Sequence, residues 1–254
     1  MIIPGIDIDN GKIAVITEQL DSEAEFLLHR VLSSQLKDRD HGHCILVSTY
    51  HDLSHWSTLE SRSNIQLSSP HLSKRFEFID SQLLLESLDG DCSLHLTTLY
   101  GKIIQRVDEI TAGYATPQSR SESSINVVIQ DLSHLSWIGA KEGDIIRFYR
   151  ALRGACVKRG ASLILSIRIL ATEPPNPILR DVLSHNHLII EVLPLSSGRS
   201  GAVSGEIIVR PGPWGLGSET PTVIPTTTRK TAVQYRLTDS GAVFFQKGTA
   251  GGVL

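Results

Sequence analysis

The chain contains 254 residues, of which 41% are hydrophobic and 20% are charged, and its formal net charge is −3. This composition is ordinary for a globular protein, and the length is sufficient for one α/β domain with a sizeable core. A small negative charge creates no global basic field, so nucleic acid could be bound only through local basic patches.

The cysteines and the apolar runs exclude further classes of protein. Cys44, Cys92 and Cys156 are too few and too scattered for a disulfide framework or a four-ligand zinc site. His43 and Cys44 would point to opposite faces of a strand, so this pair predicts no metal site either. The N-terminus lacks the basic region and apolar core of a signal peptide, and no apolar run reaches the ~18 residues of a membrane span. We therefore expect a soluble intracellular protein that makes no membrane contact.

Residues 12–36 predict a strand, a loop and a helix. Ile13–Ile16 run without a polar break, which is typical of a strand covered on both faces. Ser22–Glu25 then fits a capping box, which predicts the start of a helix. Leucines follow on one helical face, at Leu28, Leu32 and Leu36.

The loop between this strand and this helix carries a chemical signal. In nucleotide-binding α/β proteins, phosphate lies in the loop between such a first strand and first helix. Residues 18–23 contain no glycine that would let the backbone approach a phosphate and no lysine that would balance its charge. Glu18, Asp21 and Glu23 would instead repel an anion at the helix N-terminus. The sequence therefore predicts a nucleotide-binding architecture without a phosphate-binding loop.

Alternating strands and helices continue through the middle of the chain. Buried apolar runs predict strands at 43–48, 125–131 and 161–169, and alternating polar and apolar residues predict a short strand with one exposed face at 75–79. Helical spacing of apolar residues predicts helices at 53–59, 94–110, 142–157 and 178–184. The polar stretch 112–124 and the proline-rich stretch 172–177 predict loops.

The last third of the chain has a different pattern. Two pairs of short strands predict antiparallel hairpins, at 187–193 with 203–210 and at 232–237 with 242–246. Strand–helix units followed by hairpins predict a mainly parallel central sheet that is flanked by helices and extended by an antiparallel C-terminal edge. This is the layout of a single RecA-like domain over residues 1–254.

Several segments resemble the family of the sixth subunit of the Elongator complex. The most specific is the terminal VQYRLTDSGAVFFQKGTAGGVL from Val233, which joins a YR-x-x-D hairpin to FF-x-KG. The other segments occur in the family's order along nearly the whole chain, and they are FLLHRVLSSQLK at 26–37, LSHWS at 53–57, VVIQDLS at 127–133 and LSHNHLII at 183–190.

This resemblance implies a function. Elongator modifies the wobble uridine of certain tRNAs, and its subunits four, five and six are RecA-like folds that form a heterohexameric ring. The ring docks on the catalytic core of the complex and binds tRNA, whereas the chemistry belongs to another subunit. The resemblance therefore implies a non-catalytic subunit without a cofactor or a metal, located in the cytoplasm and also in the nucleus.

The resemblance also selects candidate tRNA-binding residues. In RecA-like rings, the loops after the late core strands face the central hole, where nucleic acid passes. Arg168, Arg180 and Arg199 lie in or next to these segments, so we expect them to contact tRNA phosphates. The alternative is that they are solvent-exposed charges or form salt bridges between subunits.

Two other groups leave competing functions open. Asp131 ends a central strand where an ATPase places its magnesium-side acid, but it lacks the lysine and hydroxyl partners, so loop amides could equally satisfy it. His51–His55 contains the residue types of a nucleophilic triad, although Asp52 or Ser54 could simply cap a helix there. The competing functions are therefore an active RecA-type ATPase of the recombination-paralogue kind and a hydrolase.

Overall fold

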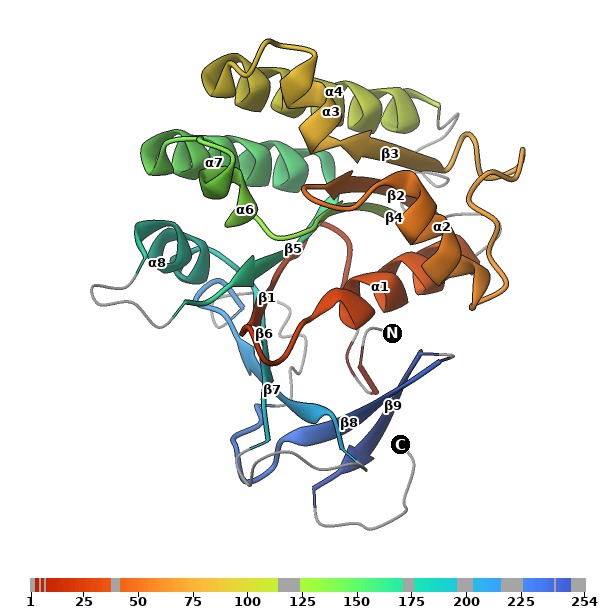
Figure 1. Cartoon of the computed structure of the whole chain (residues 1–254), viewed down its shortest axis with the longest axis vertical. Coiled ribbons are helices and arrows are strands. Elements are labelled where there is room, and N and C mark those ends of the chain that lie inside the picture. The colour runs from red at the N-terminus through yellow and green to blue at the C-terminus, as the bar shows by residue number, and fades with distance from the viewer. Residues whose placement is uncertain are drawn as a thin grey trace.

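A nine-stranded sheet runs through the protein in the order β3-β2-β4-β5-β1-β6-β7-β8-β9 (Figure 1). The computed structural model describes residues 3–4, 6, 8–37, 42–113, 124–170, 176–195, 203–215, 226–239 and 241–247. The strands are β1 (Ile13–Glu18), β2 (Gly42–Ser48), β3 (Phe76–Asp80), β4 (Ser124–Ile129), β5 (Ser162–Arg168), β6 (Leu188–Leu193), β7 (Gly205–Pro211), β8 (Val233–Thr238) and β9 (Gly241–Gln246).

The direction of the strands changes once across this sheet. The strands from β3 to β6 are all parallel, and β6 to β9 pair antiparallel. β1 lies between β5 and β6, and all six of its residues are buried, as the unbroken apolar run predicts. The predicted fold class, a mainly parallel α/β sheet with antiparallel C-terminal hairpins, is confirmed.

Helices cover both faces of the parallel part of the sheet (Figure 1). Alternate residues of β1 point to opposite sides, so Ile13 and Val15 enter one core while Ala14 and Ile16 enter the other. The helices are α1 (Glu25–Lys37), α2 (Leu53–Ser61), α3 (Ser81–Glu86), α4 (Cys92–Ala112), α6 (His134–Trp137), α7 (Glu142–Arg159) and α8 (Pro177–Ser184).

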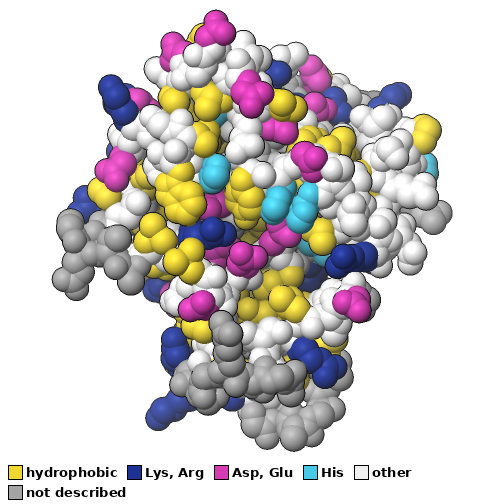
Figure 2. Space-filling model, viewed as in Figure 1, with side chains coloured by type: hydrophobic (Ala, Val, Ile, Leu, Met, Phe, Trp, Pro, Cys, Tyr) yellow, Lys and Arg dark blue, Asp and Glu magenta, His cyan; other side chains and the backbone are white. Residues whose placement is uncertain are grey.

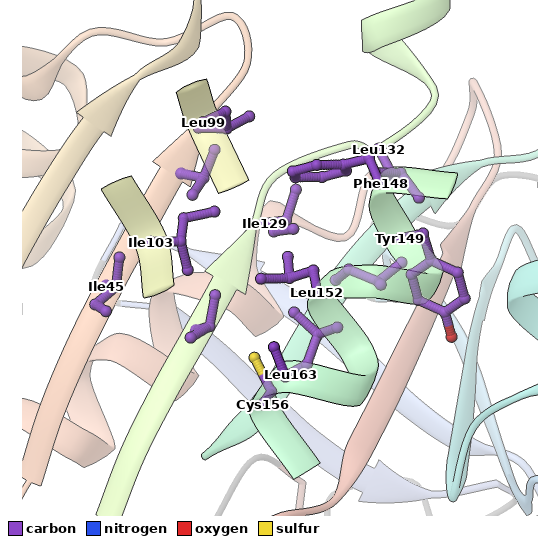
Figure 3. Close-up of a cluster of buried hydrophobic side chains, with 14 of the residues drawn as sticks. Ile45, Leu99, Ile103, Ile129, Leu132, Phe148, Tyr149, Leu152, Cys156 and Leu163 are labelled. Atoms are coloured by element: carbon purple, nitrogen blue, oxygen red, sulfur yellow. The ribbon is translucent and has the colours of Figure 1, made fainter. Parts of the chain in front are cut away.

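The first core lies between the sheet and helices α4, α7 and α8. Figure 3 shows Ile129 of the sheet between Ile103 of α4 and Leu152 of α7, with Ile45 on the other side of Ile103. The second core lies under α1 and α2 and extends to the C-terminal hairpin, where Phe26 stacks on Tyr235 with ring centroids 4.5 Å apart. The antiparallel edge is therefore held by α1 as well as by its own strand pairing.

The N-terminus of α1 differs from the prediction. The Ser22 hydroxyl donates to the carbonyl of Val192 at 3.2 Å, so it does not cap the helix. The carboxylate of Glu18 accepts a hydrogen bond from the Ala24 amide at 2.7 Å instead. The predicted capping box is therefore wrong, because a side chain from the end of β1 reaches the helix amide first.

Other elements agree with the sequence to within a few residues. Gly160 ends α7 with a φ of 72°, the left-handed conformation that a glycine adopts readily. The short helices α3 and α6 were not predicted, since each spans too few residues for a periodic pattern. Most of the predicted loop 112–124, all of the segment 196–201 and parts of the segments 172–177 and 211–228 lie outside the described residues. Within the described part of the chain, no helix combines the length and apolar character that crossing a membrane requires.

Candidate functional site at the carboxyl edge of the sheet

The carboxyl ends of β1, β4 and β5 bring three charged side chains together. Glu18 is the last residue of β1, and its Cα partner in the β1–β5 register is Arg168, the last residue of β5. Asp131 follows β4, the neighbour of β5 on the other side. Ligand crevices of open α/β sheets lie at these strand ends, so this is the place where a nucleotide would bind.

Glu18 is buried, and both of its carboxylate oxygens have partners. Oε2 accepts from the Ala24 amide at 2.7 Å, while Oε1 accepts from Nη2 and Nε of Arg168 at 3.1 and 3.2 Å. Burial raises the pKa of the Glu18 carboxyl, and the Ala24 amide and Arg168 oppose that rise. The predicted acidic loop therefore contains an internal ion pair at the start of α1.

This pair occupies the position at which a helix N-terminus would receive phosphate. Free amides at the first turn attract anions because they and the helix dipole present positive charge. Here the Ala24 amide already binds a carboxylate from the same chain. The loop is closed further by the backbone bridge between Gln19 and Ser22 and by the bond from Ser22 to Val192. An incoming phosphate would therefore meet a buried negative charge.

Asp131 is satisfied largely by its own loop. Its Oδ1 accepts from the amides of Ser133 at 3.1 Å and Arg168 at 3.3 Å, and also from the Ser133 hydroxyl. Its amide donates to the Ser166 hydroxyl at 2.8 Å, and its φ of 40° turns the chain away from β4. Oδ2 makes no hydrogen bond to any described residue. Backbone amides therefore hold one oxygen of Asp131, as the alternative to a magnesium-side acid expects.

Two of the three arginines predicted to bind tRNA, Arg168 and Arg180, lie in different surroundings. Arg168 is mostly buried, with 15% of its side chain exposed, and it pairs with Glu18. Arg180 lies on the exposed side of α8, and among the described residues its guanidinium has no ion-pair partner. Arg199 lies outside the described residues. The structure therefore brings Arg168 to the strand edge and leaves Arg180 open to solvent.

A second cluster lies beside this site, where α2 follows β2. Asp52 caps α2, accepting from the amide of His55 at 2.9 Å, and the Ser54 hydroxyl also donates to Asp52 at 2.8 Å. The capping alternative is confirmed, and a Ser-His-Asp arrangement is absent, because Ser54 pairs with Asp52 while His51 and His55 face Glu25.

The two histidines and Glu25 form a compact group. The imidazole rings stack with centroids 3.7 Å apart, and the Nε2 atoms of His51 and His55 lie 3.1 and 3.0 Å from the two oxygens of Glu25. Sequence reasoning missed Glu25 because it lies 30 residues before His55. The only local signal was an acid in the first turn of α1, which also fits a favourable interaction with the helix dipole.

Comparisons with known proteins place this geometry in a family. The chain shares its fold with a KaiC-like protein from the hyperthermophilic archaeon Pyrococcus horikoshii OT3, at a TM-score of 0.63 and 8% identity, over 93% of this chain and 90% of that one. At that identity the likeness shows the RecA-like fold alone. No curated protein matches the sequence. The model of the family described as Elongation complex protein 6 matches residues 6–239. The chain therefore belongs to the Elongation complex protein 6 family, an accessory subunit of Elongator.

Proposed function

We propose that the chain is a non-catalytic subunit that assembles with Elongator subunits four and five into a heterohexameric ring. The ring would dock on the catalytic core, bind tRNA and support modification of the wobble uridine. Membership of the family and the RecA-like fold support the assignment to Elongator. The observation that carries the non-catalytic role is the Glu18–Arg168 pair at the start of α1.

The pair opposes nucleotide binding for an energetic reason. A triphosphate at this position would have to take the Ala24 amide and the Arg168 guanidinium from Glu18. Breaking a buried ion pair leaves an uncompensated charge and costs about 3–5 kcal/mol. The loop 18–23 also contains no lysine whose attraction to the phosphate would offset this loss. Any nucleotide hydrolysis would accordingly belong to the assembled ring and not to this chain alone.

Exposed apolar side chains at the same edge support a role in assembly. Leu20, Leu53 and Trp137 are 66%, 44% and 53% exposed. They follow β1, β2 and β4, so all three lie at the carboxyl edge of the sheet. The face drawn in Figure 2 also carries hydrophobic side chains among acidic and histidine groups. Apolar groups gathered at one edge are typical of a surface that a partner covers.

The tRNA contacts would come from Arg168, Arg180 and Arg199. Arg180 is the best supported of the three candidates, because its side chain is exposed on α8 and has no ion-pair partner among the described residues. Arg168 is expected to contribute least, since Glu18 already neutralises its charge. Contacts of this kind bind phosphates and carry little sequence information, so tRNA identity would be read elsewhere.

Co-purification tests the assembly. The full chain is co-expressed with subunits four and five, and the mass of the complex is measured by native mass spectrometry. A stable ternary ring that retains tRNA is the expected result, and failure of the chain to join the other two would end the proposal.

Titration of the isolated chain with a fluorescent ATP analogue tests the non-catalytic role separately. We expect no saturable binding, and tight stoichiometric binding would favour the competing ATPase function.

A further inference from the structure

Three potential metal ligands converge at the carboxyl edge, next to the Glu18–Arg168 pair. Glu25 begins α1, His51 lies in the loop after β2, and His55 lies in the first turn of α2. One ligand atom from each residue lies within 4.8 Å of the other two. The side chains are 23%, 32% and 33% exposed, so an ion could reach them from solvent. Figure 2 shows histidine side chains gathered in this way on one face of the molecule.

A shell of buried hydrogen bonds holds these three groups in place. The Gln130 amide donates to Oε2 of Glu25 at 3.1 Å, and its own Oε1 accepts from the Ser48 hydroxyl at 2.6 Å. The Ser48 hydroxyl also accepts from the amide of His51 at 3.2 Å. Gln130 and Ser48 are each 1% exposed. Such outer partners are typical of metal sites, where they orient the ligating carboxylate and the ligand backbone.

The donor set has a clear chemical preference. Two imidazole nitrogens and one carboxylate oxygen suit Zn²⁺ and leave one of its four positions open. Without an ion, both histidines must share one carboxylate as their partner. A metal ion binds histidine through a nitrogen of the neutral imidazole, and the Glu25 carboxylate supplies negative charge at this site.

We propose that Glu25, His51 and His55 form a binding site for a divalent transition metal ion, Zn²⁺ by preference, with water in the open position. To bind the ion through Nε2, each neutral imidazole would carry its proton on Nδ1, and the ion would take the place of the Nε2–Glu25 hydrogen bonds. It would connect the start of α1 to the start of α2, two elements that are also joined by packing, by the Glu25 hydrogen bonds and by the Ser33–Glu60 hydrogen bond. It would also place positive charge beside the acidic loop.

Zinc titration of the metal-free full chain tests this site by calorimetry. We expect one ion per chain, and at least a ~tenfold loss of affinity in each of His51→Gln, His55→Gln and Glu25→Gln. His71→Gln is the matched control, because His71 is exposed and contacts Ser69 instead of the cluster. The His71→Gln variant should bind one zinc ion with the affinity of the wild type.

Cobalt provides a second readout that reports on the ligands themselves. Co²⁺ should give visible d–d absorption bands in the wild type and in His71→Gln, and these bands should disappear in His51→Gln/His55→Gln. Zinc should likewise raise the thermal midpoint of the first two proteins only.

Two outcomes would overturn the site. Zinc bound equally by the wild type and the double variant would place the ion elsewhere. Absence of saturable binding by the wild type would leave the cluster a hydrogen-bonded group. Circular dichroism without metal confirms that each variant is folded, and Glu25→Gln, which keeps the side-chain shape, decides the question should the double variant unfold.

Discussion

Two acidic clusters at the same edge of the sheet have opposite designs. At the first, Glu18 is buried, and the Ala24 amide and the Arg168 guanidinium bind its two carboxylate oxygens from within the chain. At the second, Glu25 is partly exposed and faces His51 and His55 at hydrogen-bond distance. The first site is closed to an anion by its own carboxylate, whereas the second is accessible to a cation. Ala24 and Glu25, which are adjacent at the start of α1, thus belong to two clusters, of which one is closed to anions and the other is open to cations.

The largest expected effect comes from opening the closed cluster. Arg168→Ala removes the only cation that pairs with Glu18 among the described residues, and leaves a buried carboxylate without its charge partner. We expect a loss of about 3–5 kcal/mol in the free energy of unfolding, measured by urea denaturation. Arg147→Ala is the control, since Arg147 is 77% exposed and its one ion-pair partner among the described residues is Asp144 on its own helix. It should cost less than about 1 kcal/mol. Equal losses in both variants would mean that Glu18 does not depend on Arg168.

A third carboxylate shows what happens when burial comes without a strong partner. Glu60 of α2 accepts from the Ser33 hydroxyl at 2.8 Å, but its Oε1 makes no hydrogen bond to the described residues, and Nε2 of His29 lies 3.7 Å away. Burial raises the pKa of Glu60 from 4.5 to about 7, opposed by the Ser33 hydroxyl. The folded state therefore holds the proton more tightly than the unfolded state, and stability should fall as the pH rises from about 4.5 to about 7.

Glu60→Gln removes this dependence. The amide keeps an oxygen that can accept from Ser33 and never ionises. At pH 8 we expect the variant to be more stable than the wild type by up to about 3 kcal/mol, and at pH 5 by very little. Urea denaturation at the two pH values measures both differences. Glu86→Gln, at an exposed position on α3, should show no such divergence. A constant difference between variant and wild type at both pH values would contradict the assignment to Glu60.

The contrast between the clusters also shows what the sequence could predict. Apolar runs and helical spacing are local, so they located the strands and long helices and the change to hairpins. The absence of glycine and lysine in 18–23 predicts a loop that does not bind phosphate, and this stays a prediction. The partners were not predictable, because Glu18 and Arg168 lie 150 residues apart and meet only through the β1–β5 register. The cap of α1 was misplaced for the same reason: the Glu18 side chain returns to the helix from a strand end.

A smaller effect is expected at the proposed tRNA contacts. In the assembled ring, Arg180→Ala/Arg199→Ala should weaken tRNA binding. The slope of log affinity against log salt concentration should become shallower by about two, which is about one for each lost phosphate contact. Filter binding at several salt concentrations gives this slope, and native mass spectrometry checks that the ring persists. Arg180 is exposed and has no ion-pair partner among the described residues, so its loss should leave the fold unaffected. Normal tRNA affinity together with a lost ring would assign these arginines to a subunit interface.

The smallest effect should come from the open cluster, and it completes the comparison with Arg168. His55→Gln removes one partner of Glu25, but the group is partly exposed and water can replace the imidazole. In metal-free buffer we therefore expect a change of less than about 1 kcal/mol in the free energy of unfolding, measured as for Arg168→Ala. Zinc should increase the difference in the free energy of unfolding between the wild type and His55→Gln. An ion that binds only the folded wild type raises its stability in proportion to the logarithm of the zinc concentration. A large loss without metal would mean that the histidines and Glu25 are structural partners of the same kind as Glu18 and Arg168. A small loss that grows with the zinc concentration would mean that the two neighbouring clusters differ in kind. The first is closed by the carboxylate of Glu18, and the second binds a cation from solvent at the start of α1.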